Sequence, residues 1–258
     1  MALADHLREL RARVLVAVTS ILVGMVVAWF FYDEINELLL EPYRSAQETL
    51  AAQGVKTEPI VSGIATSLLL QLKISALASV VVTSPIWLYE IWAFIVPGLH
   101  PRERRSTKMF AVIAGPLFVA GVATAYYVLP KGMEVLLGFT IADVQSFVEL
   151  DRYLGFLIRM MLVFGIAFEI PLFVVMLNLA GVVTGKQLGR YRPWSIIFTF
   201  VFAAVATPST DPFSMLFLAV PMLVLFGIAE IIARLADRAR GRGEHSTEKW
   251  DDDEASVL

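Results

Sequence analysis

Two glutamates, Glu9 and Glu103, each lie in a strongly basic segment directly before an apolar run. Glu9 stands among Arg8, Arg11 and Arg13 in HLRELRARV, and Glu103 stands among arginines in HPRERR. A carboxylate binds a guanidinium through two parallel hydrogen bonds, a geometry that a lysine ammonium cannot match. One interpretation is that the two carboxylates form a receptor site for paired cationic residues of a ligand.

A simpler interpretation is that each glutamate pairs with a neighbouring arginine. Glu9 and Arg13 are four residues apart, and such a pair on a helix contributes only about 0.3 to 0.5 kcal/mol. The residues themselves leave both interpretations open.

The elements that carry these glutamates are membrane spans. The 258-residue chain is 57% hydrophobic and 17% charged, with a mean hydropathy of +0.70. A soluble domain carries about 25% charged residues. The composition therefore predicts an all-α integral membrane protein.

Six apolar blocks predict six transmembrane helices, because most are long enough to cross a hydrocarbon core of about 30 Å. They cover residues 14–32, 67–96, 109–129, 153–180, 194–206 and 213–233.

The lengths of the blocks predict their shapes. The second block needs a tilt or a kink, whereas the fifth and sixth predict short spans. Internal prolines in spans two, three, four and six predict bends, and we hypothesise that these bends shape a concave wall. These prolines are Pro85, Pro116, Pro171 and Pro221.

The distribution of positive residues predicts the orientation. Fifteen of the 21 Lys and Arg residues lie on one side, in the N-terminal segment, the loops at 97–108 and 181–193, and the tail; four lie on the other side. Basic loops remain in the cytoplasm, so we expect both termini there, in the cytoplasmic (inner) membrane of a cell.

The remaining segments suggest one membrane domain with an appended tail. Residues 1–233 form the six-helix domain, and the polar residues 234–258 predict a disordered cytoplasmic tail. In the first outer loop, EINELLLEPY predicts a short amphipathic helix that ends at Pro42. GVVTG at 181–185 is interpreted as a turn.

The motifs of common enzymes are missing, since the sequence has no phosphate-binding loop, nucleophile elbow, zinc-protease helix or dinucleotide fingerprint. Zero cysteines exclude thiolate metal sites, and three histidines do not favour a His-rich one. We expect no enzyme activity, no metal and no cofactor, and any work draws on a partner or on the membrane potential.

Glu169 is a carboxylate near the middle of the fourth span. An ionised carboxylate in hydrocarbon is costly. Three interpretations compete: a polar lining of the concave face, which we favour, a proton-sensing group, or a structural hydrogen bond.

Five motifs resemble those of the TatC family, the multispanning subunit of the twin-arginine translocase. They are HLRELRARV, LLLEPY, SPIWLYEIWAFIVPGLHPRERR, FGIAFEIP and ATPSTDPFSMLFLAVPM, and they follow in order across all six spans.

The resemblance implies a core receptor that binds twin-arginine signal peptides of folded cargo proteins at the cytoplasmic face. The carboxylates Glu9 and Glu103 receive the arginine pair in this interpretation. Arg11, Arg104 and Arg105 are further candidates beside them.

Other candidates follow from the same resemblance. Phe94 joins the signal-binding set, although an interfacial anchor explains it as well. Pro42 matches a functional position, although a helix stop explains it as well. We group it with Glu169 and Asp211 as functional polar or cavity positions.

The family implies partners of two kinds: single-span TatA- and TatB-type proteins docked along spans five and six, and further copies of the chain. A glutamine common in the last span is Met215 here, so polar docking contacts would rest on Thr207 and Ser214. A glutamate often found later is Gly227, with Glu230 on the same face. Export would be driven by the proton-motive force.

A proton-coupled small-molecule transporter using Glu169 and Glu90 is the competing interpretation. Such transporters usually show internal repeats with broken helices. The two halves of this sequence show no convincing repeat.

Overall fold

The computed structural model describes residues 3–52, 57–99, 104–138, 146–206 and 212–240, and nearly all of them are helical. The elements are α1 (Leu3–Phe30), α2 (Tyr32–Ala52), β1 (Thr57–Ile60), α3 (Thr66–Val82), α4 (Ser84–Leu99), α5 (Arg104–Gly138), β2 (Ser146–Glu149), α6 (Leu150–Leu179), α7 (Gly185–Arg190), α8 (Arg192–Ala206) and α9 (Pro212–Ala239).

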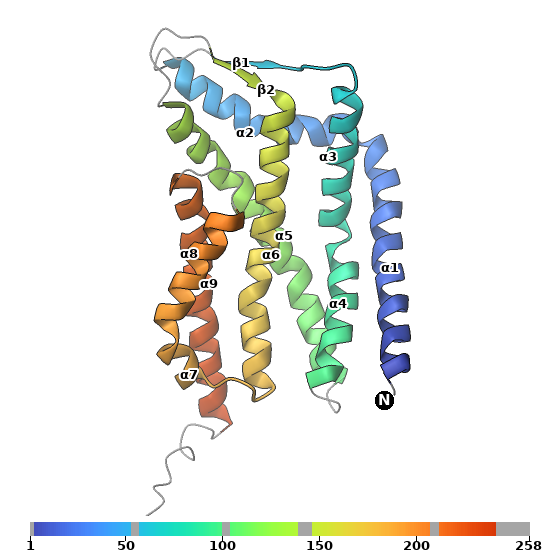
Figure 1. Ribbon diagram of the computed structural model, residues 1–258, viewed down its shortest axis with the longest axis vertical. Helices are drawn as coiled ribbons and strands as arrows, with labels where there is room; N and C mark the ends of the chain where they lie inside the picture. The colour runs from blue at the N-terminus through green and yellow to red at the C-terminus, as the bar shows by residue number, and fades with distance from the viewer. Residues whose placement is uncertain (1–2, 53–56, 100–103, 139–145, 207–211, 241–258) are drawn as a thin grey trace, which may run out of the picture.

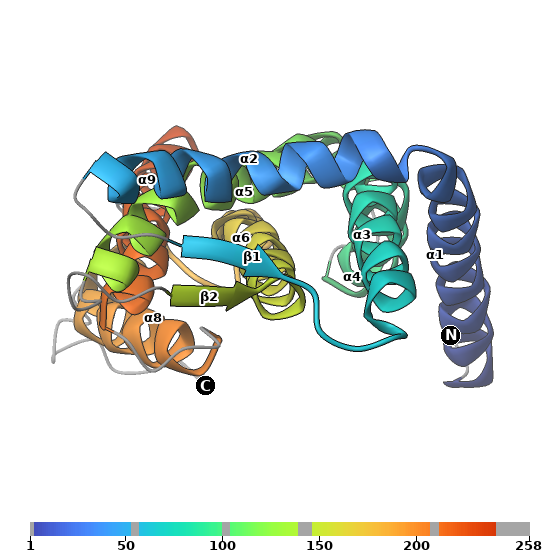
Figure 2. The same ribbon diagram turned by 90° about the horizontal axis from the view of Figure 1, so that it is seen from above.

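The long helices stand side by side and share two distinct ends (Figure 1). At one end α2 crosses the bundle, close to a small parallel sheet in which Thr57 of β1 pairs with Ser146 of β2. The N-terminus, the end of α4, α7 and the end of α9 gather at the opposite end. Seen from above, α1 lies at one edge of the bundle and α8 at the other (Figure 2).

Four single helices, within α1, α5, α6 and α9, are long and apolar enough to cross a membrane. The pair α3 and α4 supplies a fifth crossing if its two parts are counted as one span, broken by a bend of 59°. The predicted kink is thereby confirmed, and Pro85 explains it because proline lacks the N–H for a helical hydrogen bond. Among the described residues α8 has 15 and is a shorter apolar helix, as predicted for span five.

The expectation of a short sixth span is wrong, because α9 has 28 residues. The helix continues past the apolar block to Ala239, where Asp237 ties it to the turn after α6. Oδ1 of Asp237 accepts from Asn178 Nδ2 at 3.0 Å, and Oδ2 accepts from the Gly185 N–H at 2.5 Å. These contacts stabilise polar helical turns that the sequence assigned to the tail; residues 241–258 lie outside the described part.

The expectation that Pro42 ends a short helix is also wrong, because α2 runs through it to Ala52. The carbonyl of Leu38, which cannot pair with a proline nitrogen four residues on, accepts instead from the Tyr126 hydroxyl at 2.9 Å. The Tyr153 hydroxyl donates to the neighbouring Leu39 carbonyl at 3.0 Å. Tertiary contacts therefore satisfy the backbone that proline leaves unpaired.

The core forms where α6 packs against α5 and α9, and α4 also packs against α5. Gly121 of α5 and Gly165 of α6 allow the close approach: a Cβ on Gly121 would lie 2.6 Å from the Phe164 carbonyl oxygen. The predicted turn at 181–185 is confirmed, with Gly181 at φ 79°. This packing holds α4 against α5 and leaves α1 in contact with α3 and α4.

Candidate functional site

Glu9 lies in a three-residue ion cluster that joins α1 to α4. Arg13 donates from Nη2 and Nε to Glu9 Oε1 at 2.7 and 3.0 Å, and from Nη1 to Glu90 Oε2 at 3.1 Å. The Glu9 side chain is 38% exposed, whereas Glu90 is 16% exposed. The intrahelical pair expected from the sequence is therefore present, and Glu90 extends it.

Aromatic side chains flank this cluster. Phe94 lies one helical turn beyond Glu90 on α4, and its ring stacks on His6 of α1 with centroids 4.5 Å apart. His6 and Glu9 are three residues apart and share one face of α1. Glu9 therefore lies about one helical turn from the stacked His6 and Phe94 rings, at the end of the bundle where α1 begins (Figure 1).

The structure unites only some of the predicted binding residues. It brings together Glu9 and Phe94, and it leaves Arg11 exposed on the same turn of α1 as Glu9. Glu103 lies outside the described residues. Arg104 and Arg105 begin α5, where the helix is described without their side chains.

Pro42 and Glu169 lie away from this cluster. Pro42 is buried in α2 at the opposite end of the molecule, and Asp211 lies outside the described residues. Neither carboxylate oxygen of Glu169 has a hydrogen-bond partner among the described residues.

These contacts bear on the interpretations of Glu169. The interpretation as a structural hydrogen bond finds no partner for Glu169 among the described residues. Cavity lining and proton sensing stay predictions.

The predicted partner-docking positions are spread over the start of α9. Ser214 lies in its first turn, Met215 packs against the hydrophobic core, and Thr207 lies outside the described residues. Further along α9, Glu230 binds Arg192 of α8 at 2.5 Å and Arg234 at 2.6 Å. The glutamate near Gly227 is thus engaged in an ion cluster between α8 and α9.

The sequence missed the contact of Arg13 with Glu90 and the stacking of His6 on Phe94. Glu90 was the available signal, as a carboxylate at the inner end of an apolar block. Its partner was not predictable, because the pairing depends on how α1 packs against α4.

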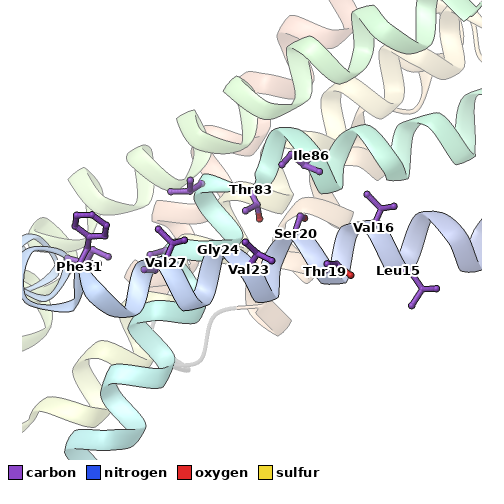
Figure 3. A pocket seen from close by; sticks show the side chains of 14 residues that line it. Leu15, Val16, Thr19, Ser20, Val23, Gly24, Val27, Phe31, Thr83 and Ile86 are labelled. Atoms are coloured by element: carbon purple, nitrogen blue, oxygen red, sulfur yellow. The ribbon is translucent and has the colours of Figure 1, made fainter.

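An apolar groove of about 820 Å³ begins near the ion cluster, with Leu15 two residues beyond Arg13 on α1 and Ile86 one turn before Glu90 on α4 (Figure 3). Leu15, Val16 and Val23 of α1 form one wall, and Thr83 and Ile86 at the bend between α3 and α4 form the other. The same two helices, α1 and α4, therefore carry both the groove and the ion cluster. Among the described residues, no group of three or more His, Cys, Asp or Glu side chains could hold a metal ion.

Comparison with known proteins gives a consistent family. The family model described as Sec-independent protein translocase protein (TatC) matches residues 5–221. The protein of that name from Frankia casuarinae is 43% identical over 265 residues, covering 100% of this chain and 73% of the relative. The one from Aquifex aeolicus is 34% identical over 244 residues, covering 93% and 98% respectively.

A solved structure gives the same result for the fold. A crystal structure of the twin-arginine translocase receptor TatC in detergent superposes with a TM-score of 0.76 at 32% identity, covering 88% of this chain and 99% of that one. Its fold is the all-helical, multi-span fold described above. These matches favour protein translocation over the small-molecule transporter considered from the sequence, and they place the chain among transport proteins and not among enzymes. The chain belongs to the TatC family of Sec-independent protein translocase subunits.

Proposed function

We propose that this chain is the receptor of a twin-arginine translocation system and binds signal peptides of folded cargo proteins at the cytoplasmic face. The observation that carries the proposal is Glu9, a partly exposed carboxylate beside the Phe94 and His6 rings at the end of the bundle. Together with Glu103, it would receive the two guanidinium groups. Arg11, Arg104 and Arg105 would line the approach.

The strength of the contacts sets a limit on what the carboxylates do alone. Each charge-assisted hydrogen bond contributes about 1.5 to 3 kcal/mol, so two contribute about 3 to 6 kcal/mol. Such energies correspond to dissociation constants from millimolar to tens of micromolar. The apolar segment that follows the arginines in the signal must therefore add a docking surface of its own.

The groove between α1 and the α3–α4 bend supplies such a surface (Figure 3). It begins near Leu15, two residues beyond Arg13, and Ile86 on its other wall lies one turn before Glu90. An apolar helix whose preceding arginines sit at Glu9 would enter it directly. We propose this groove as the part of the predicted concave wall that holds the apolar segment.

The orientation follows from the two ends of the bundle. The start of α1 and the end of α9 lie at the same end (Figure 1). In the sequence, the N-terminal segment, the loops at 97–108 and 181–193, and the tail hold fifteen of the 21 Lys and Arg residues. Basic segments stay in the cytoplasm, so we propose six crossings with both termini cytoplasmic, counting the bent pair as one and α8 as one.

We propose that TatA- and TatB-type single-span subunits dock along α8 and α9, where Met215 and Ser214 lie, and that further copies of the chain assemble with them. At about 1.5 Å per residue, the 15 residues of α8 reach about 22 Å. This is less than the hydrocarbon thickness of about 30 Å, and the mismatch thins the bilayer locally. Short partner helices would fit such a thinned region, and the proton-motive force would drive export.

A binding measurement tests the receptor proposal. A peptide with an Arg–Arg pair and its apolar segment is titrated against the detergent-purified full chain, Glu9→Gln and Glu103→Gln, with a Lys–Lys peptide beside it. Both substitutions should weaken Arg–Arg binding by roughly tenfold or more, and the Lys–Lys peptide should bind poorly to every variant.

The matched control is Glu34→Gln, which removes an exposed carboxylate of α2 at the opposite end. It should bind like the parent chain. Unchanged Arg–Arg binding after both Glu9→Gln and Glu103→Gln would overturn the proposal.

A further inference from the structure

We infer that Arg13 is an internal competitor for the signal's arginine at Glu9, and that Glu90 holds Arg13 when the exchange occurs. The inference rests on the proposed receptor function. It assigns Arg13 and Glu90 as residues that set affinity and specificity for a guanidinium ligand.

The competition follows from the geometry of the Arg13 fork. Its Nε and Nη2 atoms both donate to Glu9 Oε1, so Arg13 occupies one of the two oxygens that an incoming guanidinium needs for two parallel hydrogen bonds. Within the described part of the chain, Glu9 Oε2 accepts no hydrogen bond, and the side chain is 38% exposed. A ligand arginine can therefore start at Oε2 and displace Arg13 from Oε1.

The exchange leaves no guanidinium unpaired, because Arg13 uses a third atom for its other partner. Its Nη1 donates to Glu90 Oε2 at 3.1 Å, independently of the two bonds to Glu9. Glu90 is 16% exposed and belongs to α4, so it stays in place while α1 receives the ligand. Removing one partner of a desolvated ion pair is costly, and Glu90 avoids that cost here.

The exchange also favours arginine over lysine. A single ammonium would have to displace a two-pronged guanidinium contact with a point charge, which is the weaker interaction with a carboxylate. The internal pair therefore rejects ligands that cannot replace both bonds. The site discriminates between ligands by making them compete with a contact it already has.

The test measures dissociation constants of the Arg–Arg and Lys–Lys peptides for Arg13→Gln, Arg13→Lys and Glu90→Gln in the full-length protein. Arg13→Gln should bind the Arg–Arg peptide roughly two- to fivefold more tightly. Arg13→Lys keeps the charge but loses the fork, so it should tighten binding by a smaller factor. Glu90→Gln removes the second carboxylate partner of Arg13, so Arg13 pairs with Glu9 only. This variant should bind the Arg–Arg peptide roughly two- to fivefold more weakly.

Specificity gives a readout that a purely structural ion pair would not change. In Arg13→Gln the affinity for the Lys–Lys peptide should increase more than the affinity for the Arg–Arg peptide. The dissociation constant of the Lys–Lys peptide divided by that of the Arg–Arg peptide should therefore fall. Arg8→Gln is the matched control: it removes the same charge from an exposed position on the same helix that forms no ion pair with a described residue. It should leave the ratio unchanged.

Different results identify different failures. If Glu9→Gln leaves Arg–Arg binding intact, the receptor proposal itself is wrong. If Glu9→Gln weakens binding but Arg13→Gln and Arg13→Lys bind no tighter than the parent, the exchange is wrong and Arg13 is a structural ion pair. If Arg8→Gln and Arg13→Gln increase the affinity for the Arg–Arg peptide equally, the effect comes from net charge alone. That result would also overturn the exchange.

Discussion

At the scale of residues, carboxylates of this chain differ in what surrounds them. Glu9 is partly exposed and shares Arg13 with Glu90, whereas Glu230 has an 8% exposed side chain and two arginine partners. Glu169 has no hydrogen-bond partner among the described residues. The three carboxylates therefore require different tests: Glu9 is available to a ligand, Glu230 joins two helices, and Glu169 lies within a span.

The Glu230 cluster should contribute to stability. Glu230→Gln removes the charge that Arg192 of α8 and Arg234 of α9 both bind. Because the arginines are largely exposed and return to water, we expect a loss of about 1 kcal/mol, which lowers the melting temperature by about 2 to 4 °C. Thermal unfolding in detergent measures it.

Glu169→Gln is the contrasting variant. It exchanges a carboxylate without a described hydrogen bond for a neutral amide of similar shape, so the melting temperature should not fall. A fall as large as that of Glu230→Gln would show that Glu169 has a structural partner.

The sequence predicted the local contact at the site and missed the distant one. Glu9 and Arg13 are four apart on one helix, so helical periodicity suffices to pair them. The contact of Arg13 with Glu90 joins residues 77 apart. It depends on how α1 lies against the bent pair α3–α4, which no local pattern encodes.

At the scale of elements, long-range hydrogen bonds also decided where helices end. Four apolar blocks coincide with helices long enough to cross a membrane, the second block coincides with the bent pair α3 and α4, and Pro85 marked that bend. The sequence stopped α2 at Pro42 because proline leaves a carbonyl unpaired, but Tyr126 of α5 pairs with that carbonyl. It ended α9 early because Asp237 is polar, but Asn178 and Gly185 bind that side chain.

The role of Tyr126 in holding α2 is testable with its neighbour as a control. Tyr126→Phe removes the donor to Leu38 and should cost about 1 kcal/mol, seen as a lower melting temperature. Tyr127→Phe changes an adjacent hydroxyl on a side chain that is 76% exposed and should have no measurable effect. Equal melting temperatures for the two variants would mean that the Leu38 contact contributes nothing.

At the scale of the whole molecule, one end carries α2 and the sheet, and the other carries the ion cluster, α7 and the end of α9 (Figure 1). The proposed function requires the second end to face the cytoplasm. The chain has no cysteine, so single cysteines report on sidedness without a background.

We predict opposite labelling of the two ends in intact cells. Ser45→Cys on α2 should react with a membrane-impermeant maleimide from outside, whereas Lys186→Cys on α7 should react only after the inner membrane is opened. Both positions are exposed. Labelling of both from the same side would contradict the placement of α2 and α7 on opposite sides of the membrane.

The central claim is that twin arginines dock where α1 meets α4. The most direct measurement is photocrosslinking from a signal peptide that carries a benzophenone residue immediately before its Arg–Arg pair, followed by mass spectrometry of the crosslinked full-length protein. We predict crosslinks within residues 6–13 of α1 and 87–95 of α4, and their loss in Glu9→Gln. Crosslinks that fall instead on α2 and the β1–β2 sheet, or on α8 and α9, would contradict the account.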